Sequence, residues 1–226
     1  MHILILGASG MVGQAALRAC LLDPRVNRVT ALVRKPGGIG GGKVQELLCP
    51  DLFAIAAITD QLGTPDACLF CAGVSSVGMS EADYLHATYD LTLTVARLLA
   101  GVNPAMRFLY VSGSGTDSTE RGRSMWARVK GATENTLTQL GFAGVALFRP
   151  GYIQPLHGIR SKVGWYNALY AFLMPVYPIL KRAAGKYVTD TETLGRAMLA
   201  AVQPGVATAI YESVDINRIG DKGDAV

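Results

Sequence analysis

Short runs of apolar residues alternate with longer amphipathic stretches along most of the chain. The runs have the length of buried strands, and the stretches between them carry apolar residues at helical spacing. The predicted strands are HILILG, RVTALVR, KVQELLC, ACLFCAG, MRFLYVS and VALFRPG, and the predicted helices between them include MVGQAALRACLL, EADYLHATYDLTLTVARLLA and WARVKGATENTLTQL. Such alternation indicates right-handed crossovers and a parallel sheet covered on both faces. We therefore predict a doubly wound α/β fold.

In sheets of this kind the ligand lies outside the carboxyl ends of the strands. The loops that should meet around one site are therefore those that follow Leu6, Val33, Cys71, Val111 and Phe148. The site residues considered below fall on these loops or on the helices that follow them.

The alternation loosens after Gly151. The stretch GWYNALYAFLMPVYPILKR is rich in aromatic residues and has basic flanks, so residues 165–182 could pack on a partner subunit or lie on a membrane surface. We favour a substrate-side cap over residues 152–187, or a subunit contact. A last helix (TETLGRAMLAAVQ) and strand (TAIYESV) complete the fold, and NRIGDKGDAV is predicted to be a loose tail. The 226 residues, half of them apolar, suit one domain over residues 1–226.

The bulk composition argues against several classes of protein. The net charge of +4 is modest and the basic residues are scattered, which does not favour nucleic-acid binding. The four cysteines do not form paired CxxC motifs and the three histidines are widely separated, so we predict no metal site. The sequence has no long apolar run without polar breaks, and MHILILG lacks the features of a secretory signal. We expect a cytoplasmic protein.

A glycine-rich turn, GASGMVG, follows the first predicted strand and opens the first predicted helix. Its first glycine allows a tight turn, the second lets the backbone approach a pyrophosphate, and the third lets helix pack on strand. The helix N-terminus then offers free N–H donors to the phosphates. The residues assigned to this phosphate-binding turn are Gly7, Ala8, Ser9, Gly10, Met11, Val12 and Gly13. The turn predicts a Rossmann fold that binds a dinucleotide.

The residues at the end of the second strand favour NADP over NAD. Sites that prefer NAD place an acid there, whereas an arginine suits the 2′-phosphate of NADP. Arg34 and Lys35 occupy this place, although both side chains could simply point to solvent, and NAD stays possible. Weaker assignments to the cofactor follow the third and fourth strands: Asp51, Leu52, Cys71, Ala72 and Gly73. Asp51 could equally be an ordinary helix N-cap.

Taken in order, the motifs GASGMVG, CPDL, CAG, YVSGSG, WARVK and FRPG resemble the short-chain dehydrogenase/reductase superfamily. The similarity is greatest to its atypical and extended branches, which include epimerase/dehydratase-like and NmrA-like proteins, and it covers residues 1–153 or so. The resemblance implies binding of NAD(P) and an oxidoreductase or epimerase-like activity on a small carbonyl or hydroxyl substrate. Members often pair through the helices beside the active site, so a homodimer is one expectation.

The same resemblance implies catalytic positions. In this superfamily a Tyr exchanges a proton with the substrate oxygen, and a Lys four residues later holds the ribose hydroxyls and lowers the pKa of the Tyr. Lys130 matches the Lys, and Ser112 or Ser114 matches a Ser that follows the fifth strand. Trp126 stands where the Tyr is expected. Indole only donates a hydrogen bond and does not titrate, so it cannot replace the Tyr as an acid.

Three interpretations remain. The acid has moved, with Tyr152 and Tyr166 as candidates; or the chain is an inactive NADP(H)-binding sensor or interaction module, as in NmrA-like proteins; or Trp126 packs on the nicotinamide or substrate while water or Ser114 handles the proton. We favour an enzyme slightly, because packing alone does not explain the retained Lys and serine loop. The structural alternatives are that Trp126 fills space on a helix and that Lys130 is a solvated charge paired with Glu134.

Overall fold

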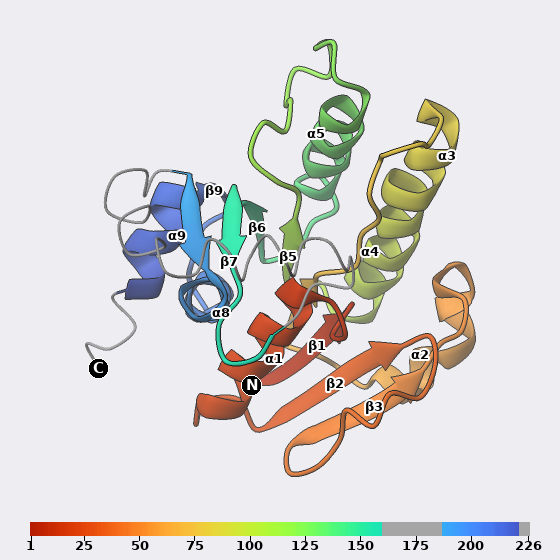
Figure 1. The fold of residues 1–226 in the computed structure, drawn as a ribbon. Coiled ribbons are helices and arrows are strands. Elements are labelled where there is room, and N and C mark those ends of the chain that lie inside the picture. The colour runs from red at the N-terminus through yellow and green to blue at the C-terminus, as the bar shows by residue number, and fades with distance from the viewer. Residues whose placement is uncertain (160–186, 222–226) are drawn as a thin grey trace.

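The computed structural model describes residues 1–159 and 187–221, and its centre is a single large parallel sheet (Figure 1). The sheet has seven strands in the order β3-β2-β1-β4-β5-β6-β9, and every neighbouring pair is parallel. The strands are β1 (His2–Leu6), β2 (Arg28–Val33), β3 (Val44–Leu48), β4 (Ala67–Phe70), β5 (Arg107–Val111), β6 (Gly144–Arg149) and β9 (Ala209–Glu212). The strand order reverses its direction of growth between β1 and β4. This confirms the predicted doubly wound sheet of the Rossmann type, a class in which ligands bind outside the carboxyl ends of the strands, where the order reverses.

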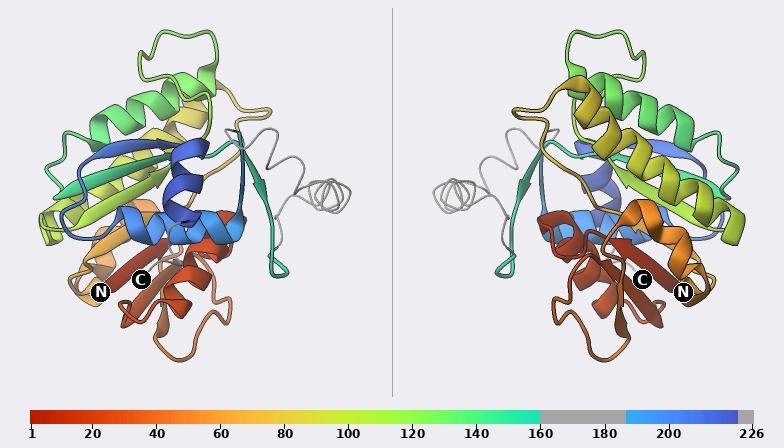
Figure 2. Two further views of the ribbon diagram at one scale, coloured as in Figure 1. Left: turned by 90° about the vertical axis from the view of Figure 1, so that its left-hand side faces the viewer. Right: turned by 90° about the vertical axis from the view of Figure 1, so that its right-hand side faces the viewer.

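Helices cover both faces of the sheet (Figure 2). One face carries α1 (Met11–Leu22), α8 (Thr191–Ala201) and α9 (Ser213–Gly220). The other carries the 3-10 helix η1 (Leu52–Ile58), α2 (Thr59–Leu62), α4 (Leu91–Val102) and α5 (Met125–Leu137). The helix predicted around EADYLHATYD is continuous with α4, as α3 (Glu81–Leu85) and a π-helical turn, η2 (His86–Asp90).

Strand residues alternate between two apolar cores. Ile3 and Ile5 pack in the core beneath α1 and α8, whereas Leu4 and Leu6 pack in the core beneath α4 and α5. All four side chains are fully buried. Successive side chains of a strand point to opposite faces, so a strand covered on both sides is apolar throughout. This is the physical reason why the strands are readable as uninterrupted apolar runs.

The prediction of a loose tail over the last ten residues was wrong in its first part. Residues 213–220 form α9, which begins with a capping box between Glu212 and Asp215. The helix is amphipathic and buries Ile216 against the core beneath α8. The capping pair in ESVD is itself a helix-start signal, which the reading of this stretch as strand and tail overlooked.

A second, two-stranded parallel sheet pairs β7 (Tyr152–Gln154) with β8 (Val188–Asp190). These strands bracket the segment predicted to be a cap, of which residues 160–186 lie outside the described part of the chain. The interpretations of residues 165–182 as a cap, subunit contact or membrane contact, and of Tyr166 as an acid, fall within that segment. Among the helices that the structure describes, none is long and apolar enough to cross a membrane.

Candidate functional site

The glycine-rich turn brings the loops after β1 and β4 into direct contact. Gly7 adopts a positive φ of 81°, and a Cβ placed on it would lie 2.7 Å from the amide nitrogen of Ala72 and 2.8 Å from the carbonyl carbon of Cys71. Only glycine fits such a backbone in such a space. The two loops that were predicted to meet at the switch point therefore do so.

The other two glycines of the turn have different surroundings. A Cβ on Gly13 would overlap the carbonyl oxygen of Gly7, so this position is closed by packing. A Cβ on Gly10 would meet only that same oxygen, at 3.4 Å, and is otherwise open. Gly10 is the N-cap of α1 and supplies no side-chain cap. Free backbone amides at an open helix N-terminus form a cradle for an anion, so these residues fit the pyrophosphate of a dinucleotide.

Two positively charged side chains, those of Arg34 and Lys35, stand at the end of β2. Arg34 and Lys35 are exposed, and within the described residues neither side chain makes a hydrogen bond or an ion pair. The glycine-rich loop that follows is held by Glu46 on β3, which accepts from the amides of Gly37 at 3.1 Å and Ile39 at 2.9 Å. This leaves both cations available at the place where a 2′-phosphate was predicted.

The weaker cofactor assignments occupy the same end of the sheet. Asp51 is the N-cap of η1 and accepts from the amide of Phe53 at 2.9 Å, while Leu52 packs against the core beneath α4. Gly73 is exposed, and a Cβ on it would meet nothing within 4 Å. The alternative role of Asp51 as a helix cap is therefore present, and its contact with a cofactor stays a prediction.

The two candidate serines have different environments. The Ser112 hydroxyl lies 2.5 Å from Oε1 of Glu134 and 3.2 Å from the carbonyl oxygen of Phe148. Ser114 is exposed, and the loop backbone beneath it is held by a hydrogen bond from its amide to the carbonyl oxygen of Pro150, at 2.9 Å. Of the two hydroxyls, the structure commits that of Ser112 to an internal bond and leaves that of Ser114 at the surface.

Lys130 is held at the carboxyl end of β5. Its Nζ donates to the carbonyl oxygen of Ser112 at 2.6 Å and lies 3.4 Å from that of Val111. The ammonium also stands over the ring of Tyr110, 5.7 Å from its centroid. Burial lowers the pKa of Lys130 to about 8, against a smaller opposing effect of the Glu134 carboxylate. Lys130 is therefore not the solvated helix charge of the structural alternative.

Trp126 lies one helical turn before Lys130 and beside the serine loop. Its side chain is half-buried, and a Cβ on Gly115 would lie 3.5 Å from the indole ring. The ring thus covers the loop that carries Ser114. The structure brings Trp126, Lys130 and the serine loop together, as the spacing along the sequence predicted.

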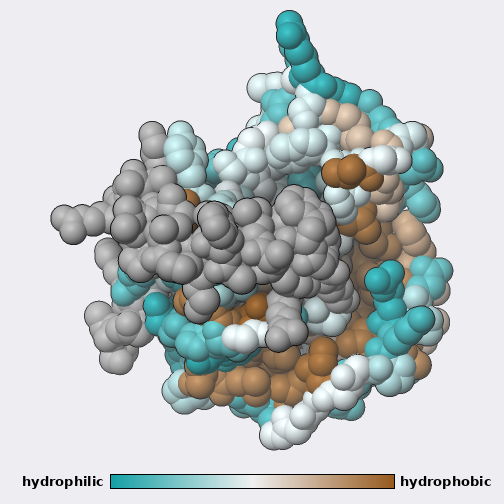
Figure 3. All heavy atoms as spheres, in the orientation of Figure 1, coloured by the Kyte–Doolittle hydropathy of each residue, from teal (hydrophilic) through white to brown (hydrophobic). Residues whose placement is uncertain are grey.

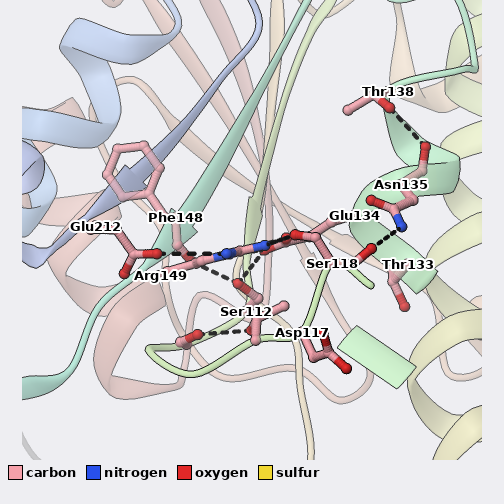
Figure 4. A network of polar contacts seen from close by, with 12 residues as sticks. Ser112, Asp117, Ser118, Thr133, Glu134, Asn135, Thr138, Phe148, Arg149 and Glu212 are labelled. Atoms are coloured by element: carbon pink, nitrogen blue, oxygen red, sulfur yellow. Dashed lines mark hydrogen bonds and ion pairs between the residues drawn. The ribbon is translucent and has the colours of Figure 1, made fainter. Parts of the chain in front are cut away.

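Glu134 is paired with Arg149, at the end of β6, and not with Lys130 (Figure 4). The guanidinium Nε lies 3.1 Å from each carboxylate oxygen, and Nη2 donates to the same carboxylate and to the Ser118 hydroxyl. Glu134 is 1% exposed and Arg149 8% exposed. This ion pair was not predicted from the sequence. Its only sequence signal is that both residues lie in motifs of the site, WARVKGATE and FRPG.

Tyr152, the candidate for a displaced acid, lies in the second sheet. Its hydroxyl donates to Oε1 of Gln154, which is buried, at 2.7 Å. This bond turns the phenol toward its own strand neighbour, so its role as an acid stays a prediction. The loop between β5 and α5 projects from the molecule (Figure 1), and its tip is hydrophilic (Figure 3).

The fold is that of the dinucleotide-binding α/β proteins. It combines a Rossmann sheet with an open glycine turn at the point where the strand order reverses. Comparison with known families is more specific. The model of the NAD dependent epimerase/dehydratase family matches residues 3–121, more than half of the chain, and the chain belongs to this family. The match ends just before Trp126 and Lys130.

Known proteins resemble this chain in sequence or in fold. The leucinostatins biosynthesis cluster protein T of Purpureocillium lilacinum is 31% identical over 62% of this chain, and the match spans only 52% of that protein. Protein FMP52, mitochondrial, of Meyerozyma guilliermondii is 21% identical over the whole chain and 97% of its own length. The fold resembles the Bordetella bronchiseptica enzyme WbmH, crystallised with NAD+, with a TM-score of 0.66 and 16% identity over 93% of this chain and 74% of that one.

These relatives contradict the expectation of a cytoplasmic protein. The FMP52 protein of Meyerozyma guilliermondii and the fmp52 proteins of Emericella nidulans and two Aspergillus species are all named as mitochondrial. The expectation rested on the lack of a secretory signal and of a long apolar run. Neither feature distinguishes the cytoplasm from other compartments, because a packed α/β core has the same composition in each.

Proposed function

We propose that this chain binds NADP(H) and acts as an oxidoreductase or epimerase-like enzyme on a small carbonyl or hydroxyl substrate. The observation that carries the proposal is the pair of free cations, Arg34 and Lys35, at the end of β2 beside the open glycine turn. Family membership and the NAD+ named with WbmH support a nicotinamide dinucleotide, and the two cations favour its 2′-phosphorylated form.

Each part of the crevice has a role in this proposal. The amides at the start of α1 hold the pyrophosphate, and Arg34 and Lys35 hold the 2′-phosphate. Lys130 donates to a ribose hydroxyl, since a primary ammonium has three N–H donors and the bonds to the carbonyl oxygens of Ser112 and Val111 use two. Ser114 and the ring of Trp126 face the substrate. When bound, the cofactor supplies or accepts the hydride.

Replacing Arg34 with aspartate should weaken NADPH binding by about tenfold or more, because a charge-assisted hydrogen bond contributes about 1.5–3 kcal/mol. Binding of NADH should change little or improve. Titration of the purified protein with each nucleotide, followed by tryptophan emission, measures both constants. Arg97→Asp, which reverses an exposed charge on α4, is the matched control and should leave both unchanged. Unchanged NADPH affinity in Arg34→Asp would remove the phosphate assignment, and binding of neither nucleotide to the native chain would remove the proposal itself.

A second candidate function is an NADP(H)-binding sensor or interaction module without redox chemistry. The observation that favours it is Trp126 in place of the proton donor, with the Ser112 hydroxyl committed to Glu134. The indole offers no titratable proton to a substrate oxygen. The two functions differ in whether the remainder of the site still accepts a substrate.

Trp126→Tyr separates these two functions. If only the acid is missing, this substitution should create or raise NADPH-dependent reduction of small aldehydes or ketones by about a hundredfold, which is within the contribution of a general acid. The measurement is the loss of NADPH absorbance across a carbonyl panel. Trp126→Phe, which restores no acid, should show no gain. If Trp126→Tyr binds NADPH normally and reduces nothing in the panel, the sensor function is supported.

A further inference from the structure

Two polar groups of Ser112, its hydroxyl and its carbonyl oxygen, bond to side chains on the same face of α5. Its hydroxyl donates to Glu134 at 2.5 Å, and its carbonyl oxygen accepts from Lys130 at 2.6 Å. Lys130 and Glu134 are four residues apart, which places them on neighbouring turns of one helix face. One cation and one anion of α5 thus bond to the residue that follows β5, the cation to its carbonyl oxygen and the anion to its hydroxyl.

Arg149, and not Lys130, forms the ion pair with Glu134. The Glu134 carboxylate accepts from Nε and Nη2 of Arg149 and from the Ser112 hydroxyl (Figure 4), and the side chains of Glu134 and Arg149 are buried. A bidentate guanidinium fixes the plane of a carboxylate. Lys130 instead donates to two neutral backbone carbonyls, and its bond to that of Ser112, at 2.6 Å, is shorter than its bond to that of Val111, at 3.4 Å.

We infer that Ser112 is a positioning residue, which Glu134 and Arg149 hold so that its carbonyl oxygen fixes the Lys130 ammonium toward the cofactor. In this arrangement Ser114 is the serine that meets the substrate. The part of the inference that concerns the cofactor rests on the proposed function. The hydrogen bond that holds Lys130 to the carbonyl oxygen of Ser112 is present in the protein without cofactor.

The arrangement also explains why two serines follow β5 at this spacing. A hydroxyl that donates a short bond to a buried carboxylate has no proton left for a substrate oxygen. Moving Ser112 would displace the carbonyl that Lys130 requires. The two serines therefore have different roles, since Ser112 holds Lys130 and Ser114 is exposed.

The test measures the reaction of Lys130 with acetic anhydride in the cofactor-free protein at several pH values, quantified by mass spectrometry of the peptide. In the native protein the rate should be low and should reach half of its plateau near pH 8, as the ammonium loses its proton. Ser112→Ala should raise the plateau rate by about fivefold, which corresponds to the loss of one ordinary hydrogen bond. Ser112→Thr, which retains the hydroxyl, should behave like the native protein.

Thr136→Ala is the matched control. It removes a hydroxyl from α5, the helix that carries Lys130 and Glu134; this hydroxyl donates to the carbonyl of Ala132 at 2.9 Å and lies 3.2 Å from the Tyr89 hydroxyl on η2. Its Lys130 rate should equal that of the native protein. Equal rates in Ser112→Ala and the native protein, or an equal increase in Thr136→Ala, would overturn the proposal. Should Ser112→Ala fail to fold, Ser112→Cys replaces the hydroxyl with a weak donor of similar size and should raise the rate in the same direction.

A parallel titration with NADPH distinguishes this proposal from the proposed function. Ser112→Ala should bind NADPH about fivefold more weakly than the native protein, with Thr136→Ala unchanged. If the native protein binds no NADPH, the proposed function fails, while the labelling of Lys130 still tests whether the Ser112 hydroxyl helps to hold Lys130 in place. If Ser112→Ala frees Lys130 without weakening NADPH, the positioning role toward the cofactor is overturned.

Discussion

Replacing Arg149 with methionine will lower the free energy of unfolding by about 3–5 kcal/mol, the usual cost of removing one member of a buried ion pair. Methionine keeps an unbranched apolar stem like that of arginine but leaves the Glu134 carboxylate, 1% exposed, without its cation. Within the described part of the chain, the Ser112 hydroxyl is the side-chain donor that would remain to bond that carboxylate. Urea unfolding followed by circular dichroism measures the loss.

The double variant Glu134→Leu with Arg149→Met is the informative comparison. Removing both charges abolishes the desolvation cost that the single variant incurs, so most of the lost stability should return. A remaining deficit of about 1 kcal/mol is expected, because the Ser112 hydroxyl loses its short bond to Glu134 and keeps the longer one to the carbonyl oxygen of Phe148. If the double variant is no more stable than Arg149→Met alone, or if Arg149→Met costs less than 1 kcal/mol, then the pair does not stabilise this fold in the way described.

Substitutions at the glycines of the turn should separate folding from cofactor binding. Gly13→Ala places a methyl group onto the carbonyl oxygen of Gly7, so the turn must shift away from α1. We expect a loss of about 1–3 kcal/mol in unfolding free energy, typical of an overpacked site, together with loss of measurable NADPH binding. Thermal unfolding and nucleotide titration on the same preparation report the two effects.

Gly10→Ala is the control for that experiment. The added methyl group meets only the Gly7 oxygen at 3.4 Å, so stability should remain within about 0.5 kcal/mol of the native protein. The same methyl group projects into the phosphate cradle and should weaken NADPH by about tenfold, or about 1.4 kcal/mol. A Gly13→Ala protein as stable as Gly10→Ala would contradict the close approach of α1 to the turn.

The balance between enzyme and sensor depends on a small number of contacts. Under the proposed function Trp126 stands in the place of the proton donor, and the neighbouring Lys130 is an ammonium whose pKa is lowered to about 8 by burial. A lysine with such a pKa still carries its charge near neutral pH, which suits attraction of a phosphorylated cofactor. Both functions therefore share the same cofactor site, and the Trp126→Tyr experiment distinguishes them by chemistry alone.

Much of the fold was predictable because its signals are local. Strands buried on both faces leave uninterrupted apolar runs, and the alternation of strand and helix restricts the topology to a doubly wound sheet. The glycine turn was predictable for a similar reason, since Gly7 and Gly13 meet steric demands within one short loop and its immediate neighbours. The tail was predicted wrongly, although the capping residues Glu212 and Asp215 provided a local signal for α9.

The roles of the charged residues were not predictable in the same way. The spacing of Lys130 and Glu134 suggested an ion pair, and in a solvated helix they would form one. Here Glu134 bonds instead to Arg149 and to Ser112, while Lys130 bonds to a backbone carbonyl. Arg149 comes from β6 and Ser112 from the loop after β5, and both are distant along the chain from Lys130 and Glu134 on α5.

The sequence by itself therefore determined the class of fold, the glycine-rich turn between β1 and α1, and the place of Arg34, Trp126 and Lys130 at one edge of the sheet. Each depends on periodicity, or on the rule that parallel strands end at the same edge. The tertiary structure alone decided which serine is internal and which is exposed, and which cation neutralises Glu134. A buried charge takes the partner that satisfies it best among all the groups that folding brings near, and no spacing along the chain contains that information.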